Sequence, residues 1–218
     1  MSTPNITFLG IGLMGAPMVA RLLAHGFKVC AWNRTSAKAS ALASSGAEAE
    51  PDLLKAVQSA DVVISMLESG AVVGQVIDAA LPAVRPGTLW IDMSSTRQDE
   101  AVAFSAKLEA LGCRFLDAPV SGGVAGAEAG TLAIMAGGSV HDFAAAEPIL
   151  QAMGRPTLVG PAGSGQVAKL CNQLIVGGTL NIVAEALLLA QAAGADPAAV
   201  RAAMRGGFAE SRILDVHG

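Results

Sequence analysis

Short apolar runs alternate with amphipathic stretches along most of the chain. The runs are rich in β-branched and aromatic residues, which is typical of strands. They predict strands over residues 5–10, 28–32, 61–66, 88–92, 113–117, 131–136 and 156–159. The apolar spacing between them predicts helices over residues 16–25, 36–44, 51–59, 72–80, 100–111 and 141–153. This alternation indicates an α/β fold, a Rossmann-type, mostly parallel sheet with helices on both faces.

A long apolar helix is predicted beyond the sheet, over residues 166–193, and ends at Gly194. Asp196 and Pro197 then supply an N-cap and a first-turn proline for another helix, which runs to about residue 205. We therefore expect two domains. The first is the sheet domain of residues 1–162, and residues 163–218 form an interdomain helix and the start of an all-α domain.

Composition narrows the class of protein. Apolar residues make up 52% of the 218 residues, charged residues 15%, and 25 residues are glycine, as in a tightly packed α/β protein. The formal net charge is −4 and there is no basic stripe, so we expect no nucleic-acid partner. Cys30, Cys113 and Cys171 have no metal-ligand or disulfide spacing, so we expect reduced cysteines and no metal.

The long helix resembles a membrane span only in its length. It lacks the ~20 consecutive, predominantly apolar residues that a span needs. Its polar interruptions are Asn172, Gln173, Asn181, Glu185 and Gln191. The N-terminus leads directly into a strand, without a basic region, apolar core and cleavage site. We expect a cytoplasmic protein that makes no contact with a membrane.

A G-x-G-x-x-G motif follows the first predicted strand and opens the first predicted helix. It consists of Gly10, Gly12 and Gly15, with Leu13 and Met14 before the last glycine. The first glycine allows a tight turn, the second lets the backbone approach a pyrophosphate, and the third permits close helix packing. The helix N-terminus presents free N–H groups to the phosphates. The motif in this context predicts a dinucleotide site.

Asn33, Arg34 and Thr35 follow the second predicted strand, near the place where an NAD-binding fold carries an acidic residue for the ribose 2′-hydroxyl. Asn33 keeps a hydrogen-bonding group without a charge that would repel a 2′-phosphate. Arg34 and Thr35 supply a cation and a hydroxyl that can bind it. The pattern favours NADP over NAD.

Ligands of such sheets bind outside the carboxyl ends of the strands. We therefore expect Met66 and Leu67, at the end of one strand, to line the cofactor groove together with Ser95 and Thr96, at the end of the next.

A second glycine-rich turn and one helix face suggest a substrate site. Ser121 offers a hydroxyl, and the N–H groups of Gly122 and Gly123 can form a nest for a carboxylate. Lys169 and Asn172 are three positions apart, so they share a face of the long helix, where an ammonium and an amide can meet a small polar ligand. A plain connecting loop and a lysine that snorkels from a core helix are the alternatives.

Four motifs, in order, resemble the β-hydroxyacid dehydrogenase family, which includes 3-hydroxyisobutyrate dehydrogenase, tartronate semialdehyde reductase and glyoxylate/succinic semialdehyde reductase. They are FLGIGLMGAPM at 8–18, DMSSTR at 92–97, DAPVSGGVAGAEAGTLAIMAGG at 117–138 and GSGQVAKLCNQ at 163–173. The resemblance covers essentially the whole chain.

The resemblance implies roles for the candidate residues. Lys169 matches the catalytic acid/base, which protonates the carbonyl oxygen while the nicotinamide delivers hydride to the carbon. Ser121, Gly122 and Gly123 match the residues that hold the substrate carboxylate, and Asn172 matches a residue that orients the substrate. Thr96 matches a cofactor contact near the nicotinamide.

The subgroup follows from smaller similarities. GTLAIM at 130–135 looks more like tartronate semialdehyde reductases, and NRT at 33–35 is similar to NADPH-using glyoxylate/succinic semialdehyde reductases. Gln166 and Cys171 stand where related 6-phosphogluconate dehydrogenases carry histidines, and the related imine reductases lack the lysine. The expected function is NADP-dependent, reversible reduction of a small carboxylate-bearing aldehyde. The alternatives are a 3-hydroxyisobutyrate dehydrogenase using NAD and a dinucleotide-binding module without turnover.

Chains of this family continue through further helices beyond the position of Gly218. The resemblance therefore implies that the end of the helical domain is lacking from this sequence. Without those helices the apolar face of the long helix would be exposed, and we expect a homo-oligomer, a dimer or tetramer, to cover it.

Overall fold

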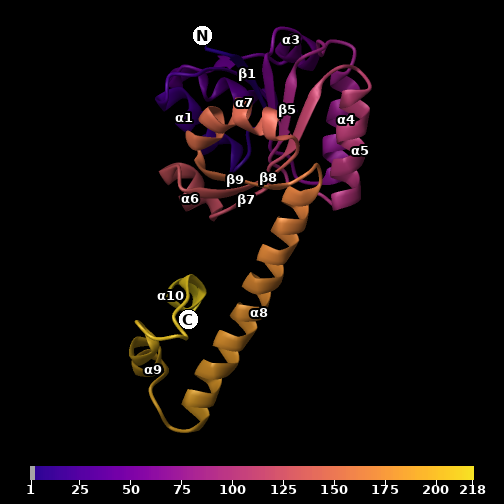
Figure 1. Cartoon of the computed structure of the whole chain (residues 1–218). Coiled ribbons are helices and arrows are strands. Elements are labelled where there is room, and N and C mark those ends of the chain that lie inside the picture. Colours follow the sequence, from indigo (N-terminus) through magenta and orange to yellow (C-terminus); the bar gives the residue numbers. More distant parts are fainter. Residues whose placement is uncertain (1–2) are drawn as a thin grey trace. The chain divides into compact units, whose positions relative to one another are not determined.

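The computed structural model describes residues 3–218 (Figure 1). The chain divides into two compact units, Met1–Lys169 and Leu170–Gly218. The first unit contains every strand of the described chain and ends inside the long helix α8 (Ser164–Ala192). The first turns of this helix, up to Lys169, therefore belong with the sheet.

The strands of residues 3–218 form one nine-stranded sheet. Their bounds are β1 (Asn5–Leu9), β2 (Lys28–Trp32), β3 (Glu48–Ala49), β4 (Val62–Ser65), β5 (Leu89–Asp92), β6 (Arg114–Asp117), β7 (Val120–Ser121), β8 (Leu132–Gly137) and β9 (Gly154–Gly160). The order is β3-β2-β1-β4-β5-β6-β8-β7, with β9 also paired to β8. Strands β1 to β6 are parallel, whereas β8 is antiparallel to β6 and β7. The predicted mostly parallel, Rossmann-like sheet is confirmed.

Helices cover both faces of this sheet (Figure 1). Those of the first unit are α1 (Gly15–Ala24), α2 (Ser36–Ser40), α3 (Leu53–Gln58), α4 (Gly70–Ala80), α5 (Gln98–Glu109), α6 (Gly123–Ala129) and α7 (Val140–Gln151). One core cluster packs α1 and α7 on one face, and the other packs α3, α4 and α5 on the opposite face. The long apolar strand runs reflect burial on both sides.

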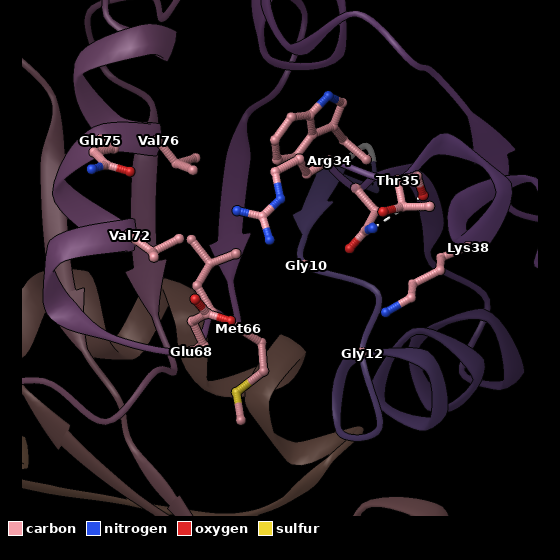
Figure 2. Close-up of a pocket in the computed structure, with 13 residues that line it drawn as sticks. Gly10, Gly12, Arg34, Thr35, Lys38, Met66, Glu68, Val72, Gln75 and Val76 are labelled. Atoms are coloured by element: carbon pink, nitrogen blue, oxygen red, sulfur yellow. Dashed lines mark hydrogen bonds between the residues drawn. The ribbon is translucent and has the colours of Figure 1, made fainter.

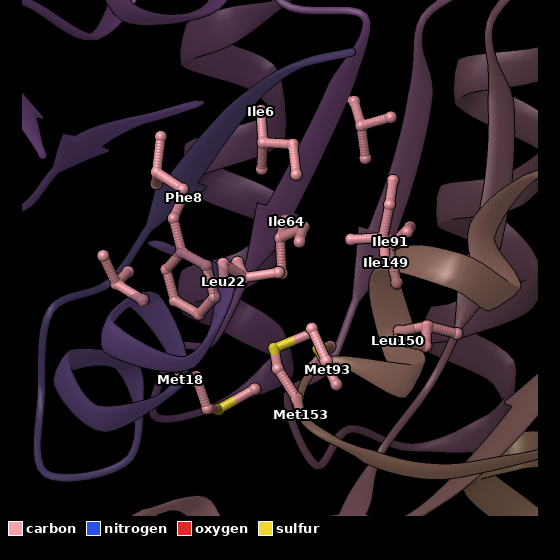
Figure 3. Packing of buried hydrophobic residues seen from close by; sticks show 14 of the residues in the cluster. Ile6, Phe8, Met18, Leu22, Ile64, Ile91, Met93, Ile149, Leu150 and Met153 are labelled. Atoms are coloured by element: carbon pink, nitrogen blue, oxygen red, sulfur yellow. The ribbon is translucent and has the colours of Figure 1, made fainter. Parts of the chain in front are cut away.

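Alternate residues of one strand serve the two cores. Phe8 of β1 is fully buried in the first cluster, together with Ile64 of β4 and Ile91 of β5 (Figure 3). Their neighbours Leu9 and Trp90 are fully buried in the second cluster. Side chains alternate across a strand with a period of two, so a continuous apolar run supplies both faces.

Three elements of the structure were not predicted from the sequence. Strands β3 and β7 are two residues long and have no apolar run to mark them. Helix α6 was also not predicted, because its sequence GVAGAEA contains no large apolar side chain except Val124. Tertiary packing stabilises this helix although its sequence has a low helix propensity. Gly126 and Ala127 are buried, and a Cβ on Gly126 would lie 3.2 Å from Leu132.

The predicted helix over 36–44 ends early. The α-helix stops at Ser40, and a 3₁₀ turn, Ala43–Ser45, leads to Gly46 with φ +97°. Serine favours turns over helix interiors, and glycine readily adopts the positive φ that ends the segment.

The second unit contains the rest of α8 followed by α9 (Pro197–Met204) and α10 (Arg212–His217). Asp196 and Ser211 cap the two short helices by accepting hydrogen bonds from Ala198 N and Leu214 N. Arg201 joins them, because its Nε and Nη2 donate to the carbonyl oxygens of Leu214 (3.0 Å) and Asp215 (2.7 Å). Helix α8 is long and apolar enough to cross a membrane by length and composition alone, so the expectation that its polar interruptions make it too polar for a span is wrong.

Candidate active site

The glycine-rich turn between β1 and α1 is shaped by two glycines that tolerate no side chain. Gly10 has φ +105°, and a Cβ there would collide with the carbonyl oxygen of Met66. A Cβ on Gly15 would collide with the carbonyl oxygen of Gly10. A Cβ on Gly12 would meet open space. The fold therefore does not itself require glycine at position 12, whereas a ligand lying directly on the backbone does.

Asn33 ties this turn to the segment after β2. Its Oδ1 accepts a hydrogen bond from Ile11 N (2.9 Å), and its Nδ2 donates to the carbonyl oxygen of Thr35 (3.1 Å). An aspartate could accept from Ile11 but could not donate to Thr35. The amide therefore has a structural task as well as the advantage of carrying no negative charge.

A cavity of about 260 Å³ opens beside the turn (Figure 2). It is smaller than the ~300–1,000 Å³ of a typical small-molecule pocket, so it suits one end of a dinucleotide. Its lining residues are Gly10, Gly12, Trp32, Asn33, Arg34, Thr35, Lys38, Met66, Leu67, Glu68, Val72, Gln75 and Val76.

The cavity contains part of the predicted cofactor set. The predicted residues that line it are Gly10, Gly12, Asn33, Arg34, Thr35, Met66 and Leu67. The others lie outside this lining. Leu13 and Met14 are in the turn before α1, Gly15 is the first residue of α1, and Ser95 and Thr96 are in the loop after β5.

Sequence reasoning missed a second cation at this cavity. Lys38, in the first turn of α2, lines it together with Arg34, and Figure 2 shows both charged groups directed into it. The signal was present, because Lys38 lies four positions beyond Arg34 where a helix was expected. Trp32 and Glu68, which are next to predicted residues in sequence, were also missed. Val72, Gln75 and Val76 of α4 were missed because only the tertiary fold brings this helix to the turn.

The predicted carboxylate-binding residues lie at a junction between β7 and α6. Ser121 ends β7 and pairs with Ala133 of β8. Gly122 is the N-cap of α6 with φ +137°, and Gly123 begins the helix with φ +62°. Both angles favour glycine. Both glycines are exposed, so a ligand can reach their backbone.

Lys169, in α8, reaches this junction. Its Nζ donates a hydrogen bond of 2.8 Å to the carbonyl oxygen of Val120, which is 49 positions away in sequence and directly precedes Ser121. The side chain is half-buried, and burial lowers the pKa of its ammonium group. The structure thus brings together Lys169 and the segment of residues 121–123. Asn172 lies in the second unit, where its Nδ2 donates to Oε1 of Gln173 (2.9 Å).

The residues present fit a dinucleotide. Gly12 leaves room above the backbone at the N-terminus of α1, which attracts phosphate. Arg34 and Lys38 supply positive charge at the same cavity, while Val72 and Val76 supply an apolar wall. A dinucleotide needs both kinds of surface.

Two family models match the chain. The model described as the NAD binding domain of 6-phosphogluconate dehydrogenase matches residues 5–178. The model described as the NAD-binding of NADP-dependent 3-hydroxyisobutyrate dehydrogenase matches residues 163–218, including α8.

Among curated proteins, 2-hydroxy-3-oxopropionate reductase of Escherichia coli K12 is 40% identical over 218 residues, 98% of this chain and 74% of the relative. Probable 3-hydroxyisobutyrate dehydrogenase of Mycobacterium tuberculosis H37Rv is 43% identical over 191 residues. That match covers 87% of this chain and 65% of the relative. The chain is therefore clearly shorter than the relatives it matches.

The solved structure of M. tuberculosis 3-hydroxyisobutyrate dehydrogenase with L-serine is similar over 99% of this chain and 74% of its own, with a TM-score of 0.92 and 38% identity. The similarity therefore includes the sheet and the helices that follow it. From these matches, the chain belongs to the β-hydroxyacid dehydrogenase family of NAD(P)-dependent oxidoreductases.

Proposed function

We propose that this chain carries the cofactor and acid/base residues of an NADP-dependent reductase, which reversibly converts a small carboxylate-bearing aldehyde to its hydroxyacid. The aldehyde is of the tartronate semialdehyde, glyoxylate or succinic semialdehyde type. The observation that carries the proposal is the 2.8 Å hydrogen bond from Lys169 Nζ to Val120 O. It holds a proton donor beside Ser121, Gly122 and Gly123, the proposed carboxylate site.

The choice of NADP over NAD rests on the charge of the cavity. Arg34 and Lys38 both line it, and Thr35 adds a hydroxyl, so a 2′-phosphate would receive charge-assisted hydrogen bonds. The pyrophosphate would lie on Gly12 at the N-terminus of α1. The remaining proposed cofactor contacts are Gly10, Leu13, Met14, Gly15, Asn33, Met66, Leu67, Ser95 and Thr96.

The bound nicotinamide supplies or accepts the hydride, and Lys169 donates or accepts the proton. During reduction its ammonium donates a proton to the aldehyde oxygen, which becomes the hydroxyl. In the reverse direction the neutral amine removes that proton. Burial lowers the pKa of Lys169, which makes proton donation easier than from an exposed lysine. Asn172, three positions further along α8, is proposed to orient the substrate.

Two relatives suggest different substrates. The E. coli relative is named as a reductase of 2-hydroxy-3-oxopropionate, which is tartronate semialdehyde, and matches 98% of this chain. The M. tuberculosis relatives are named as 3-hydroxyisobutyrate dehydrogenases and match with a slightly higher identity. A 3-hydroxyisobutyrate dehydrogenase using NAD is therefore the second candidate. Arg34 and Lys38 favour the first.

We further propose a cytoplasmic homo-oligomer. Helix α8 passes a length and composition test for a membrane span, but a family model and the M. tuberculosis structure both include it as part of this fold. Leu174, Ile182 and Leu189 of α8 are 78%, 68% and 71% exposed. Burying such side chains against a second copy would be favourable. Light scattering after size-exclusion chromatography would measure the oligomeric state, and a monomer would contradict this proposal.

The experiment that tests the function compares two reactions. Oxidation of NADPH and of NADH is followed with tartronate semialdehyde, glyoxylate and succinic semialdehyde, and reduction of NAD⁺ and NADP⁺ is followed with 3-hydroxyisobutyrate. The proposal expects the highest kcat/KM for one of the aldehydes with NADPH. A higher kcat/KM for 3-hydroxyisobutyrate with NAD⁺ would establish the second candidate. Dinucleotide binding without turnover of any substrate would favour a binding module.

A further inference from the structure

Gln166 is a buried polar side chain one helical turn before the proposed acid/base. It is 1% exposed, in the first turn of α8 and three positions before Lys169. Its Nε2 donates to the carbonyl oxygen of Ser94 (2.9 Å), and its Oε1 accepts from the backbone N–H of Thr96 (3.0 Å). One side chain therefore makes two hydrogen bonds to the backbone of the loop after β5, which is 70 or more positions away in sequence.

The backbone around Gln166 is held just as firmly. The carboxylate of Asp117, fully buried at the end of β6, accepts hydrogen bonds from Gly163 N (2.7 Å) and Gln166 N (2.9 Å). A negative charge at a helix N-terminus also interacts favourably with the helix dipole. The start of α8 is thus fixed to the carboxyl end of β6, and Gln166 links the same turn to the loop after β5.

The network continues to the dinucleotide cavity. Ser94 Oγ accepts from Leu67 N (2.9 Å) and donates to Asp92 Oδ1 (2.6 Å). Leu67 lines the cavity that contains Arg34. A series of buried and partly buried hydrogen bonds therefore runs from the cavity through Ser94 to Gln166, one turn before Lys169.

From this geometry, and resting on the proposed function, we propose that Gln166 is a positioning residue. It holds Lys169 and the loop of residues 94–96 in a fixed position relative to each other, at the nicotinamide end of the cofactor. Because Thr96 N donates to Gln166, this N–H is not available to the cofactor. An amide is required, since one group must both donate and accept. A glutamate accepts from Thr96 but, when ionised, places a carboxylate against Ser94 O.

The test separates the two ends of the cofactor by titrating each variant with NADP⁺ and with 2′-phospho-ADP-ribose, which lacks the nicotinamide. Gln166→Met keeps the side-chain length and removes both hydrogen bonds. We expect its affinity for 2′-phospho-ADP-ribose to stay within about twofold of wild type, and its affinity for NADP⁺ to fall about tenfold. Gln191→Met, an exposed glutamine of the same helix, is the matched control and should change neither affinity.

The Gln166→Glu variant adds a measurement that would not change with pH if Gln166 had only a structural role. Near pH 5 a protonated glutamate can donate to Ser94 O and restore the wild-type ratio of the two affinities, whereas near pH 8 it should behave like Gln166→Met. Taking the ratio cancels the titration of the 2′-phosphate, which both ligands carry. The same ratio is measured for Gln166→Met at each pH. This corrects for the titration of Asp92 and Asp117, the buried carboxylates of the same network.

The outcomes are decisive. Equal losses for both ligands in Gln166→Met, or no loss for either, would overturn the positioning role. If Gln166→Met does not fold, the pH dependence of the ratio in Gln166→Glu decides alone, and a ratio independent of pH overturns it. A selective loss of NADP⁺ in a protein that reduces none of the tested aldehydes would leave this inference standing while the proposed substrate class fails.

Discussion

Lys169 Nζ lies 2.8 Å from the carbonyl oxygen of Val120. This contact crosses between α8 and the strand that leads into residues 121–123, and it places a half-buried ammonium beside the exposed backbone of Gly122 and Gly123. The carbonyl uses one of the three N–H bonds of the ammonium, so the others remain for a ligand.

Replacing Lys169 tests the acid/base assignment. Lys169→Met keeps the apolar stem and removes the ammonium, so we expect kcat to fall by about 10²–10⁴-fold, the usual contribution of general acid–base catalysis. The dissociation constant for NADPH should change by less than about threefold, because the glycine-rich turn and Arg34 are intact. Stopped-flow turnover and fluorescence titration measure the two quantities. Full turnover in Lys169→Met would remove Lys169 from the mechanism.

We expect the charge of the cavity to set the preference between NADPH and NADH. Arg34→Ala should weaken NADPH by about 1.5–3 kcal/mol, the loss of a charge-assisted hydrogen bond, and leave NADH almost unchanged. Lys38→Ala should act in the same direction. Lys28→Ala is the control, because Lys28 begins β2 at the other end of the strand and does not line this cavity. Equal losses for the two cofactors in Arg34→Ala would contradict the 2′-phosphate assignment.

The two kinds of glycine in the turn should respond differently to alanine. Gly10→Ala introduces a collision with Met66 O at positive φ, so it should lower the melting temperature by several degrees, corresponding to at least ~1 kcal/mol. Gly12→Ala meets open space, so the melting temperature should stay the same while dinucleotide affinity falls by about tenfold or more. Calorimetry and titration of both variants measure this contrast. Unchanged affinity in Gly12→Ala would show that no ligand lies on this backbone.

Asp92 should make stability depend on pH. Burial raises its pKa to about 6 from 3.8, and its Oδ2 has no hydrogen-bond partner among residues 3–218. Between about pH 4 and pH 6 the folded protein therefore binds this proton more than the unfolded chain does, so the free energy of unfolding falls as the pH rises. Asp92→Asn keeps the Oδ1 acceptor used by Ser65 and Ser94 and removes this dependence.

The expected difference between wild type and Asp92→Asn across that window is on the order of 3 kcal/mol. Urea unfolding at pH 4, 5, 6 and 7 measures it, with Asp78→Asn as the exposed control that changes an ion pair with Lys107 instead. If the free energies of unfolding of wild type and Asp92→Asn changed with pH in parallel, the pH dependence would not come from Asp92.

The pattern of residues along the chain was enough to predict the parallel sheet and the place of the candidate dinucleotide site. Apolar runs such as residues 61–66 predict buried strands because each face of the strand needs apolar side chains, a local property of the pattern. The glycines at positions 10, 12 and 15 are equally local, since a tight turn constrains its own residues. The place of Arg34 after β2 also follows from the chain order, because strand ends bind ligands in this fold.

The contacts between distant segments could not be predicted in this way, because they depend on tertiary packing. Helix α4 reaches the dinucleotide cavity, Gln166 reaches Ser94 and Thr96, and Lys169 reaches Val120, in each case through packing of elements that are far apart in sequence. Helix α6 forms against β8 although its own sequence gives little signal. The reason is physical: local patterns determine which face of an element is apolar, whereas hydrogen bonds between elements depend on strand order and register, which the whole chain settles cooperatively.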